Sequence, residues 1–460
     1  MPAVFETTPT VANQVPSLPP GPRLPAALQS VRWLLGSTAF MDRCHDRFGD
    51  AFTVRLAAKA AGGPAAKRSP SPWVFLADPE LVRQLFATDP DTVRTGDTNR
   101  FLEPLVGSRS VLVQDEPRHR EQRKLLLPPL HGERICNYGA LMSDVAEARL
   151  SRWPIGEPFS LWPHMQAITL EVIVRTVFGI ADPDRVAAAT TVLGGMLNRM
   201  TSPAWLLAAS LWVTVTRSTE SRAAQRLIEP VDKIIHTEIA ERRTAKGLDR
   251  RDDILSLLLR AQYSDGSSMT DEDLRDELMT LLIAGHESTA TALAWALELL
   301  LRHPDKVARL RDEAKTGSDD YAAAVAQETL RLRPVVPFVL RNLSAPMDLG
   351  RYLLPEHTWI APCAYLINRR EDIYPRPHVF FPERFLNRPP GAYTWLPFGG
   401  GVRRCLGASF AQLEMRRVLQ AVLTHVDLVP AAPKPEKIRA RFITLAPQHG
   451  ARVIMTSRRP

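Results

Sequence analysis

Cysteine is scarce in this sequence of 460 residues, and no two cysteines lie close together. The four are Cys44, Cys136, Cys363 and Cys405, and none belongs to a C-x-x-C pair. A disulfide framework or a zinc finger needs several cysteines at short, regular spacings. The pattern therefore argues against both and favours a reducing, cytoplasmic setting.

Long apolar runs and targeting signals are also missing. The first 23 residues contain no basic segment followed by an apolar one, so no secretory signal is expected. The longest uncharged apolar stretch, residues 204–215 (AWLLAASLWVTV), is too short to span a bilayer. We therefore expect a cytoplasmic protein without a transmembrane anchor, and we expect it to act as a monomer.

Acidic residues are fewer than basic ones, since 50 Asp and Glu against 58 Lys and Arg give a net charge of +8. An excess of positive charge attracts acidic partners, although an ordinary solvated surface gives the same balance. No long Lys/Arg block and no RNP-like aromatic cluster accompanies the charge. A nucleic-acid partner is therefore not expected.

The order of patterns along the chain predicts a mainly α protein with small β-sheets. Residues 1–25 form an irregular lead-in, and residues 26–460, which no clean linker or repeat divides, are expected to form a single domain. Strand patterns occur in residues 50–56 (DAFTVRL) and 71–78 (SPWVFLAD), and again in residues 442–456 around a PQHG turn. Helical periodicity dominates between residue 79 and about residue 330.

One predicted helix is unusually long. It begins at a T-x-x-D signal, Thr270 and Asp273, and ends before His303 and Pro304, so its length is about 50 Å. Its middle (LMTLLIAGHESTATALAWAL) is apolar nearly all round, which places it in the core. A buried carboxylate such as Glu287 is costly unless it has a partner, water or a task, so it either faces a wet gap or takes part in chemistry.

The loop at residues 397–407 (PFGGGVRRCLG) lacks the Lys-Ser/Thr pair of a phosphate loop. A helical pattern (ASFAQLEMRRVLQAVL) follows it, so Cys405 lies at or just before a helix N-terminus, which is expected to lower the pKa of the thiol. The glycines at 399–401 let the backbone approach a broad group. A lone thiolate cannot complete a zinc site but can be the single axial ligand of a haem. An inert buried cysteine is the alternative.

Five motifs together resemble those of the cytochrome P-450 superfamily, the haem-thiolate monooxygenases, and are closest to its soluble bacterial members. The cysteine loop is similar to the haem-ligand signature, and residues 284–289 (AGHEST) resemble the oxygen-binding motif of the central helix. The other three are similar to the E-x-x-R pair, the PERF segment and the motif that holds a haem propionate: Glu328-x-x-Arg331, residues 381–385, and His119-x-x-x-Arg123. The resemblance implies a single catalytic haem domain with one long central helix crossing the core.

The same resemblance implies a cofactor and a role for each matching residue. The cofactor would be haem b, iron protoporphyrin IX, with the Cys405 thiolate as the iron ligand. The other haem-binding residues would be Phe398, Gly399 and Gly407 in the loop, and Arg403, His119, Arg123 and Arg341 at the propionates. A charged network behind the haem would consist of Glu328, Arg331 and Arg384.

The resemblance also implies catalytic residues and a substrate pocket on the distal side of the haem, opposite the cysteine ligand. Glu287, Ser288 and Thr289 would be catalytic, because an acid and an alcohol can relay protons during dioxygen activation. Ser288 stands where the family usually has threonine, so the hydroxyl is kept while its methyl neighbour is lost. The expected wall of the substrate pocket is apolar and consists of Phe101, Leu105, Ala284, Val336, Pro337 and Phe338.

The function implied is insertion of one oxygen atom from O2 into a lipophilic small molecule, such as a fatty acid, a terpenoid or a similar secondary metabolite, by hydroxylation or epoxidation. Electrons would come from a ferredoxin or flavodoxin with its NAD(P)H reductase. The expected basic docking site consists of Arg404, Arg416, Arg417, Arg120 and Lys124. A peroxide-using or non-oxygenating haem-thiolate enzyme, or a non-catalytic haem-binding sensor, remains an alternative.

Overall fold

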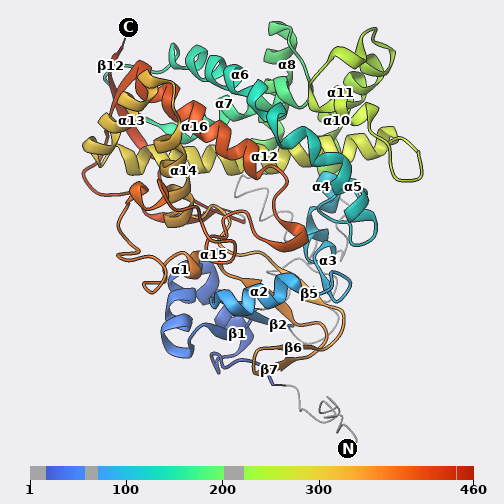
Figure 1. The fold of residues 1–460 in the computed structure, drawn as a ribbon, viewed down its shortest axis with the longest axis vertical. Coiled ribbons are helices and arrows are strands. Elements are labelled where there is room, and N and C mark those ends of the chain that lie inside the picture. Colours follow the sequence, from blue (N-terminus) through green and yellow to red (C-terminus); the bar gives the residue numbers. More distant parts are fainter. Residues whose placement is uncertain (1–16, 57–70, 201–221, 442, 460) are drawn as a thin grey trace, which may run out of the picture.

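The computed structural model describes residues 17–56, 71–200, 222–441 and 443–459. A large helical part lies above a smaller part that contains the main sheet (Figure 1). The expectation of a mainly α protein with small sheets is confirmed. The apolar stretch at residues 204–215 lies outside the described residues. Within the described ranges, no helix has the length and apolar character needed to cross a membrane.

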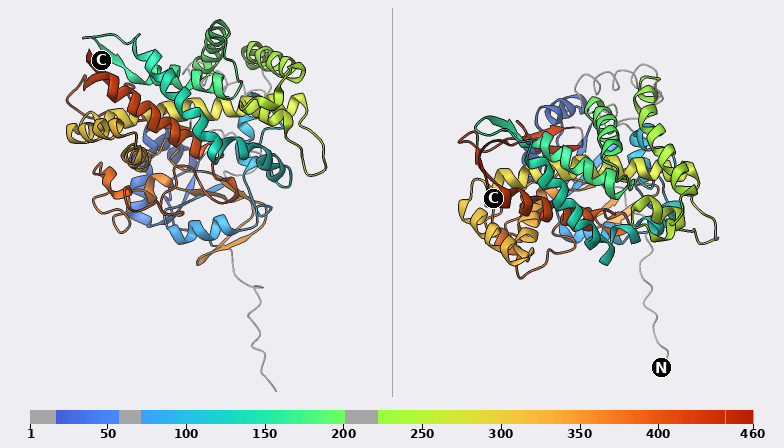
Figure 2. Two further views of the ribbon diagram at one scale, coloured as in Figure 1. Left: turned by 45° about the horizontal axis from the view of Figure 1, so that its top comes forward. Right: turned by 90° about the horizontal axis from the view of Figure 1, so that it is seen from above.

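The long central helix, α12, spans Asp271–Leu300 and crosses the helical part in all views (Figures 1 and 2). Its 30 residues give a length of about 45 Å. Thr270 caps it, and Asp273 completes the capping box, as the sequence predicts. His303 and Pro304 then open the next helix, α13 (Pro304–Thr316). The prediction of a long buried helix is therefore confirmed.

Other helices pack around α12 and form one large apolar core with it. The longest of these are α6 (Glu133–Leu150), α7 (Leu161–Thr176), α8 (Pro183–Met200), α10 (Arg222–Thr244), α14 (Asp320–Leu332) and α16 (Ala408–His425). Shorter helices are α2 (Pro79–Ala87), α3 (Gly96–Asn99), α4 (Glu103–Val106), α5 (Arg118–Leu126), α11 (Ile254–Arg260) and α15 (Ala364–Ile367). Single turns of 3-10 helix include η3 (Arg100–Leu102), η6 (Pro382–Phe385) and η7 (Gly401–Arg403).

The predicted hairpin opens the main sheet. β1 (Ala51–Arg55) pairs antiparallel with β2 (Pro72–Leu76), with Val54 opposite Trp73. β8 (Trp359–Pro362), β5 (Arg341–Leu343) and β3 (Val93–Arg94) extend the sheet in the order β1-β2-β8-β5-β3. These three strands were not predicted, because each is too short to show alternation. A separate hairpin consists of β6 (Met347–Leu349) and β7 (Tyr352–Leu354).

The two strands predicted near the C-terminus are present but belong to different sheets. β11 (Thr444–Pro447) pairs with β10 (Ile438–Arg441). β12 (Arg452–Arg458) pairs with β9 (Val426–Pro430) and β4 (Pro158–Ser160). The β10–β11 hairpin contacts α12, which brings the end of the chain to the centre of the fold.

Helix α1 (Ala26–Phe48) precedes the sheet and was not predicted. Its apolar periodicity is blurred because Leu34 and Leu35 are 76% and 84% exposed, and because Gly36 interrupts the helical geometry. It begins at the predicted boundary of the irregular lead-in. The described part of that lead-in, residues 17–25, lies along the sheet, where the Thr53 N–H donates to the Pro20 carbonyl at 2.9 Å.

Candidate functional site

Glycines determine the shape of the cysteine loop. Gly399 and Gly401 both have φ of 64°, a region that favours glycine. A Cβ atom at Gly400 would lie 2.3 Å from the Phe86 ring, so this glycine is needed for close packing against α2. The Cys405 N–H donates to the Phe398 carbonyl at 2.9 Å and closes the loop. Helix α16 begins three residues after the cysteine.

The exposure of the Cys405 side chain differs from the density of the protein around it. The side chain is exposed, yet the surrounding protein is dense enough for burial to raise the pKa of its thiol. The Gly407 N–H, Arg123 and Arg404 act in the opposite direction, but burial is the largest cause. The expectation of a lowered pKa is therefore wrong for the chain without iron. Binding to a metal ion deprotonates a thiol outright.

The middle of α12 also has an open side. Ala284 is exposed although the adjoining turns of the helix are buried in the core. Ser288 lies one turn further on the same side, where its hydroxyl donates to the Ala284 carbonyl at 2.6 Å. Thr289 is only 3% exposed and faces packed protein. Of the two predicted alcohols, Ser288 is therefore the one beside the open side of the helix.

Two cations near the loop make no ion pair with an acidic side chain among the described residues, although Asp115 interacts with Arg341 from a greater distance. Arg341 is 5% exposed, and its one hydrogen bond goes to the neighbouring Leu340 carbonyl at 2.8 Å. Burial, with a contribution from Arg403, lowers its pKa to about 9. Arg123 lies close enough to Cys405 to interact with its sulfur, and burial lowers its pKa too. Buried cations of this kind are costly unless an anion compensates them.

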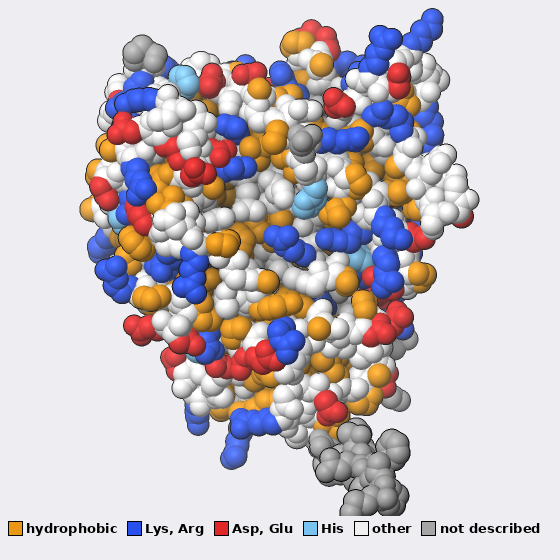
Figure 3. Space-filling model, viewed as in Figure 1, with side chains coloured by type: hydrophobic (Ala, Val, Ile, Leu, Met, Phe, Trp, Pro, Cys, Tyr) orange, Lys and Arg blue, Asp and Glu red, His pale blue; other side chains and the backbone are white. Residues whose placement is uncertain are grey.

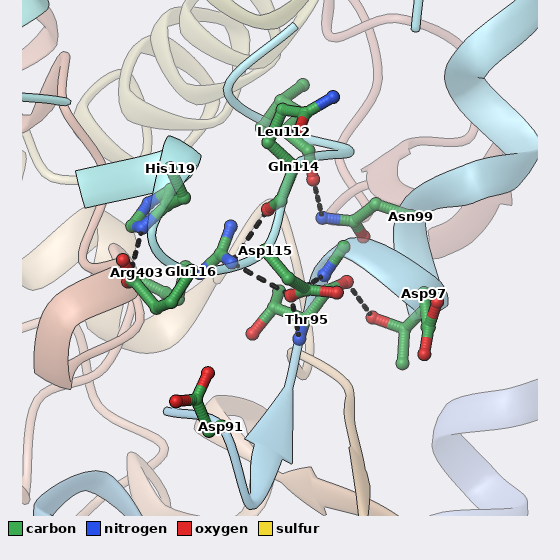
Figure 4. A network of polar contacts seen from close by, with 12 residues as sticks. Asp91, Thr95, Asp97, Asn99, Leu112, Gln114, Asp115, Glu116, His119 and Arg403 are labelled. Atoms are coloured by element: carbon green, nitrogen blue, oxygen red, sulfur yellow. Dashed lines mark hydrogen bonds and ion pairs between the residues drawn. The ribbon is translucent and has the colours of Figure 1, made fainter. Parts of the chain in front are cut away.

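The other two predicted propionate ligands have acidic partners of their own (Figure 4). Arg403 Nη2 donates to Asp115 Oδ1 at 2.9 Å and to the Gln114 carbonyl at 2.7 Å. His119 Nδ1 lies 2.9 Å from Glu116 Oε1. Burial, and then Arg403, lower the pKa of His119 to about 4, so its ring is neutral near pH 7. The two acids were not predicted, although both stand just before His119 in the sequence.

These residues fit a flat, dianionic macrocycle with one axial protein ligand. The Cys405 side chain is exposed, and Arg341 and Arg123 make no ion pair with an acidic side chain among the described residues. Among the described residues, no group of three or more His, Cys, Asp and Glu side chains could hold a metal ion. A single cysteine therefore suits a metal whose other ligands come from a cofactor, as in haem.

The predicted charged network assembles in full. Arg331 donates to both carboxylate oxygens of Glu328, at 2.7 and 2.9 Å, and both side chains are 0% exposed. Arg384 Nε lies 3.1 Å from Glu328 Oε2. Arg331 also donates to the Asn368 and Pro377 carbonyls at 2.7 and 2.8 Å. The network ties α14 to the segment that leads to the cysteine loop.

The predicted substrate-wall residues fall into two groups. Phe101 and Leu105 pack in a small cluster that includes Ile283, the residue before Ala284. Phe338 instead joins an aromatic cluster with Trp33 and Phe75, at ring-centroid distances of 5.7 and 5.2 Å. Pro337 is buried beside it, and Val336 is partly exposed. The first group therefore adjoins the open side of α12. Phe338 packs against the core of the sheet and, with Val336 and Gly399, lines a small pocket beside the cysteine loop.

The third predicted catalytic residue, Glu287, has a partner that the sequence did not indicate. Its Oε1 lies 3.6 Å from Arg441 Nε, at the end of β10. Burial raises the pKa of Glu287, and Arg441 counteracts that rise. No local signal links the two residues, because the fold alone brings the C-terminal hairpin to α12.

The fold and the site together define a haem-thiolate protein. The chain belongs to the cytochrome P450 family, whose model matches residues 19–454. A Mycobacterium tuberculosis protein named cytochrome P450 135B1 is 38% identical over 449 residues, 95% of this chain and 91% of that protein. Another protein of this organism, named cytochrome P450 137, is 36% identical over 429 residues, which cover 93% of this chain and 87% of that protein.

Solved structures agree with this assignment at the level of the fold. The structure titled "Retinoic acid bound cyanobacterial CYP120A1" has a TM-score of 0.78 at 23% identity and covers 97% of this chain and 100% of its own. The haem domain of cytochrome P450DA has a TM-score of 0.78 at 22% identity, with 97% and 99% coverage. The predicted family, fold and cofactor, haem b with a cysteine thiolate ligand, are thereby confirmed. Membership makes the protein a haem-thiolate monooxygenase in general terms.

Proposed function

We propose that Cys405 is the axial ligand of haem b and that the enzyme inserts one oxygen atom from O2 into a lipophilic small molecule. The observation that carries the proposal is the exposed Cys405 side chain, which lies near Arg123 in a chain of this family. When bound, the haem supplies the dioxygen activation that no side chain can perform alone. The Cys405 thiolate would hold the iron and supply electron density to it.

The protein's own residues bind and orient the cofactor. Arg341 and Arg123, which make no ion pair with an acidic side chain among the described residues, would pair with the propionates through charge-assisted hydrogen bonds. Arg403 and His119 would add donors while Asp115 and Glu116 hold them in place. Glu328, Arg331 and Arg384 support the loop from behind, and their role is folding and haem retention rather than chemistry.

Residues beside the open side of α12 would take up and transfer the proton. Ser288 offers its hydroxyl next to Ala284, and Glu287 precedes it on the helix. An acid and an alcohol at this place could hold a proton and pass it toward the cofactor site. Phe101 and Leu105 would exclude bulk water and contact the substrate, which supports an apolar ligand such as a fatty acid or terpenoid.

Substrate identity can be tested by a screen of lipophilic compounds. A compound that enters the pocket and displaces water from the iron should shift the Soret band to the high-spin position. Product analysis of the best ligand, with a reductase system and O2, then identifies the oxidised position. Product formation with O2 excluded would instead point to a non-oxygenating reaction. Absence of a spectral shift and of any oxidised product across the screen would point to a non-catalytic haem protein.

Ser288→Thr is expected to improve coupling between reductant use and product formation. Serine lacks the methyl group that would restrict its rotamers, and in the structure its hydroxyl turns back to the Ala284 carbonyl. A proton that is delivered to the wrong position would lead to release of peroxide instead of oxidised product. The measurement is the ratio of product formed to NAD(P)H consumed, with Thr289→Ser at the neighbouring buried position as the control. Equal ratios in the wild type and Ser288→Thr would contradict the prediction.

Electrons would come from an acidic ferredoxin or flavodoxin that docks near the cysteine loop. Arg404, Arg120 and Lys124 are exposed. Lys and Arg side chains also gather across the middle of the face of the molecule that Figure 3 shows. Arg416 and Arg417 contribute less free charge, because Asp319 lies 3.1 and 3.8 Å from them. Complementary charge mainly accelerates association.

Raising the salt concentration from low to about 1 M should slow the reduction of the haem several-fold, because exposed charges are screened at that ionic strength. Arg404→Glu should slow reduction at low salt. Arg351→Glu, on the β6–β7 hairpin, is the control and should not. Stopped-flow reduction under CO measures both effects. A rate independent of salt and of Arg404 would rule out electrostatic docking at this site.

A further inference from the structure

The loop between α4 and α5, residues 107–117, is attached to the first turns of α12 through its backbone. The Arg109 N–H donates to Asp276 Oδ2 at 2.9 Å. The Val111 N–H donates to Glu277 Oε1 at the same distance. These bonds do not depend on the rotamers of the loop side chains, so the two acids fix the path of the loop itself.

Val111 also contacts the cysteine loop through its carbonyl, which accepts from Arg403 Nη1 at 3.4 Å. Arg403 Nη2 donates to two further groups of the same segment, the Gln114 carbonyl at 2.7 Å and Asp115 Oδ1 at 2.9 Å (Figure 4). Val111 is 5% exposed, so bulk water competes weakly for its bonds. One residue therefore joins Glu277 of the central helix to the arginine that is predicted to bind a haem propionate.

The loop also decides which N–H groups of Arg403 are left for an anion. A guanidinium carries five N–H groups in a rigid, planar arrangement. Acceptors of the loop take three of them, through the bonds to Val111, Gln114 and Asp115. The other two have no acceptor among the described residues, and the loop determines their direction. A shift of Val111 would turn the guanidinium and change where these two groups point.

Glu277 is suited to hold a backbone N–H in the protein interior. It is 0% exposed, and burial, with added repulsion from Asp276 and Asp273, raises its pKa well above the usual range. The Val111 N–H and Arg118 act in the opposite direction. The neutral acid is thereby favoured, and it accepts the N–H without leaving a charge buried. Its second oxygen, Oε2, has no hydrogen-bond partner among the described residues.

Asp276 differs from Glu277 in the part of the loop that it holds. Its Oδ2 accepts from the Arg109 N–H, two residues after the loop begins. A Cβ atom at Gly107, whose φ is 88°, would lie 2.0 Å from the Asp276 carboxylate, so the loop begins in close contact with this acid. Asp276 therefore anchors the start of the loop, whereas Glu277 acts on the residue that Arg403 contacts.

We propose that Glu277 is a positioning residue that acts through the backbone of Val111 and sets the direction in which Arg403 meets a haem propionate. The inference rests on the proposed function, because it assumes that Arg403 binds the propionate. The N-terminal turns of α12 then contribute to cofactor retention, while the chemistry lies at its middle. A purely structural acid would stabilise the loop whether or not Arg403 were present, and this difference can be measured.

The test is a double-variant cycle on the holoenzyme, with the rate of haem loss to excess apomyoglobin as the readout. Arg403→Gln should raise this rate several-fold, because a charged donor to the propionate is lost. Glu277→Leu, which offers no acceptor to Val111, should also raise it several-fold. Glu277→Gln keeps a neutral acceptor and should stay near the wild-type rate. Because the two residues act as one unit, Glu277→Leu/Arg403→Gln should lose haem no faster than Arg403→Gln alone.

Thr280→Val is the matched control, because Thr280 acts on the same loop from the same helix. Its Oγ1 lies 2.6 Å from Ser110 Oγ, one residue before Val111. The variant leaves the bond from Val111 to Glu277 in place, so the rate of haem loss should be unchanged. Hydrogen exchange of the segment that contains Val111 is the second readout. Exchange should be faster than in the wild type in Glu277→Leu and unchanged in Glu277→Gln.

Additive effects of Glu277→Leu and Arg403→Gln on haem loss would overturn the inference and leave the proposed function intact, since Glu277 would then only stabilise the fold. Haem loss at the wild-type rate in Glu277→Leu, or an equal acceleration in Thr280→Val, would do the same. Should Glu277→Leu fail to fold, Glu277→Asp, which is shorter by a methylene and cannot reach Val111, takes its place in the cycle. Unchanged haem loss in Arg403→Gln would instead refute the propionate role of Arg403, and the inference with it.

Discussion

Cys405→Ser is expected to abolish the CO-bound absorption band of sulfur-ligated haem and to remove monooxygenase activity. The serine hydroxyl has nearly the size of the thiol but is a far weaker iron ligand and donates less electron density. The loop closure should survive, because it depends on the Cys405 N–H and the Phe398 carbonyl and not on the side chain. The CO difference spectrum of the purified, reduced variant measures the effect.

Cys136→Ser is the matched control, because Cys136 is exposed on α6 and far from the loop in the sequence. This variant should keep both the band and the activity. Circular dichroism of Cys405→Ser should remain that of a mainly helical protein, which separates ligand loss from unfolding. A Cys405→Ser protein that retained the sulfur-ligated band would show that another residue binds the iron.

Glu328→Gln is expected to lower the free energy of unfolding by about 3–5 kcal/mol, the usual cost of breaking a fully buried ion pair from one side. The carboxylate accepts two hydrogen bonds from Arg331, at 2.7 and 2.9 Å, and both side chains are 0% exposed. The neutral amide leaves the guanidinium uncompensated. Denaturant unfolding of the holoenzyme measures the loss, and the fraction of protein that keeps haem after purification should fall with it.

The double variant Glu328→Met/Arg331→Met provides the control. It removes both buried charges, so it should be more stable than Glu328→Gln if the uncompensated charge is the cause. A lower stability in the double variant would assign the loss to packing and to the hydrogen bonds from Arg331 to the Asn368 and Pro377 carbonyls. If Glu328→Gln lowered the free energy of unfolding by less than about 1 kcal/mol, the pair would contribute no more than an exposed surface ion pair does.

Features encoded by neighbouring residues could be predicted from the sequence. The start of α12 depends on Thr270 and Asp273, three residues apart, and the capping box forms as expected. Glu328 and Arg331 also stand three residues apart on one helix turn, so their pairing follows from helical geometry. The positive φ of Gly399 and Gly401 is likewise a local feature of the loop, whereas the packing of Gly400 against Phe86 is not.

Features that depend on distant segments could not be predicted. Arg441 meets Glu287 only because Trp295 and Leu445 bring the C-terminal hairpin to α12, and neither sequence neighbourhood carries a signal for the other. The contacts of Phe338 with Trp33 and Phe75 also join distant segments, and its place in the substrate wall stays a prediction. The pKa of Cys405 was also misjudged, because helix proximity is visible in the sequence whereas burial, the larger cause, is not.

The most direct test of the central claim is the absorption spectrum of the wild-type protein, loaded with haem b, reduced and exposed to CO. The account predicts the band diagnostic of a haem whose axial ligand is a cysteine thiolate, and its loss in Cys405→Ser. A freshly purified, haem-loaded wild-type protein that gives only the spectrum of nitrogen-ligated haem would contradict the assignment of Cys405 and the monooxygenase function that depends on it.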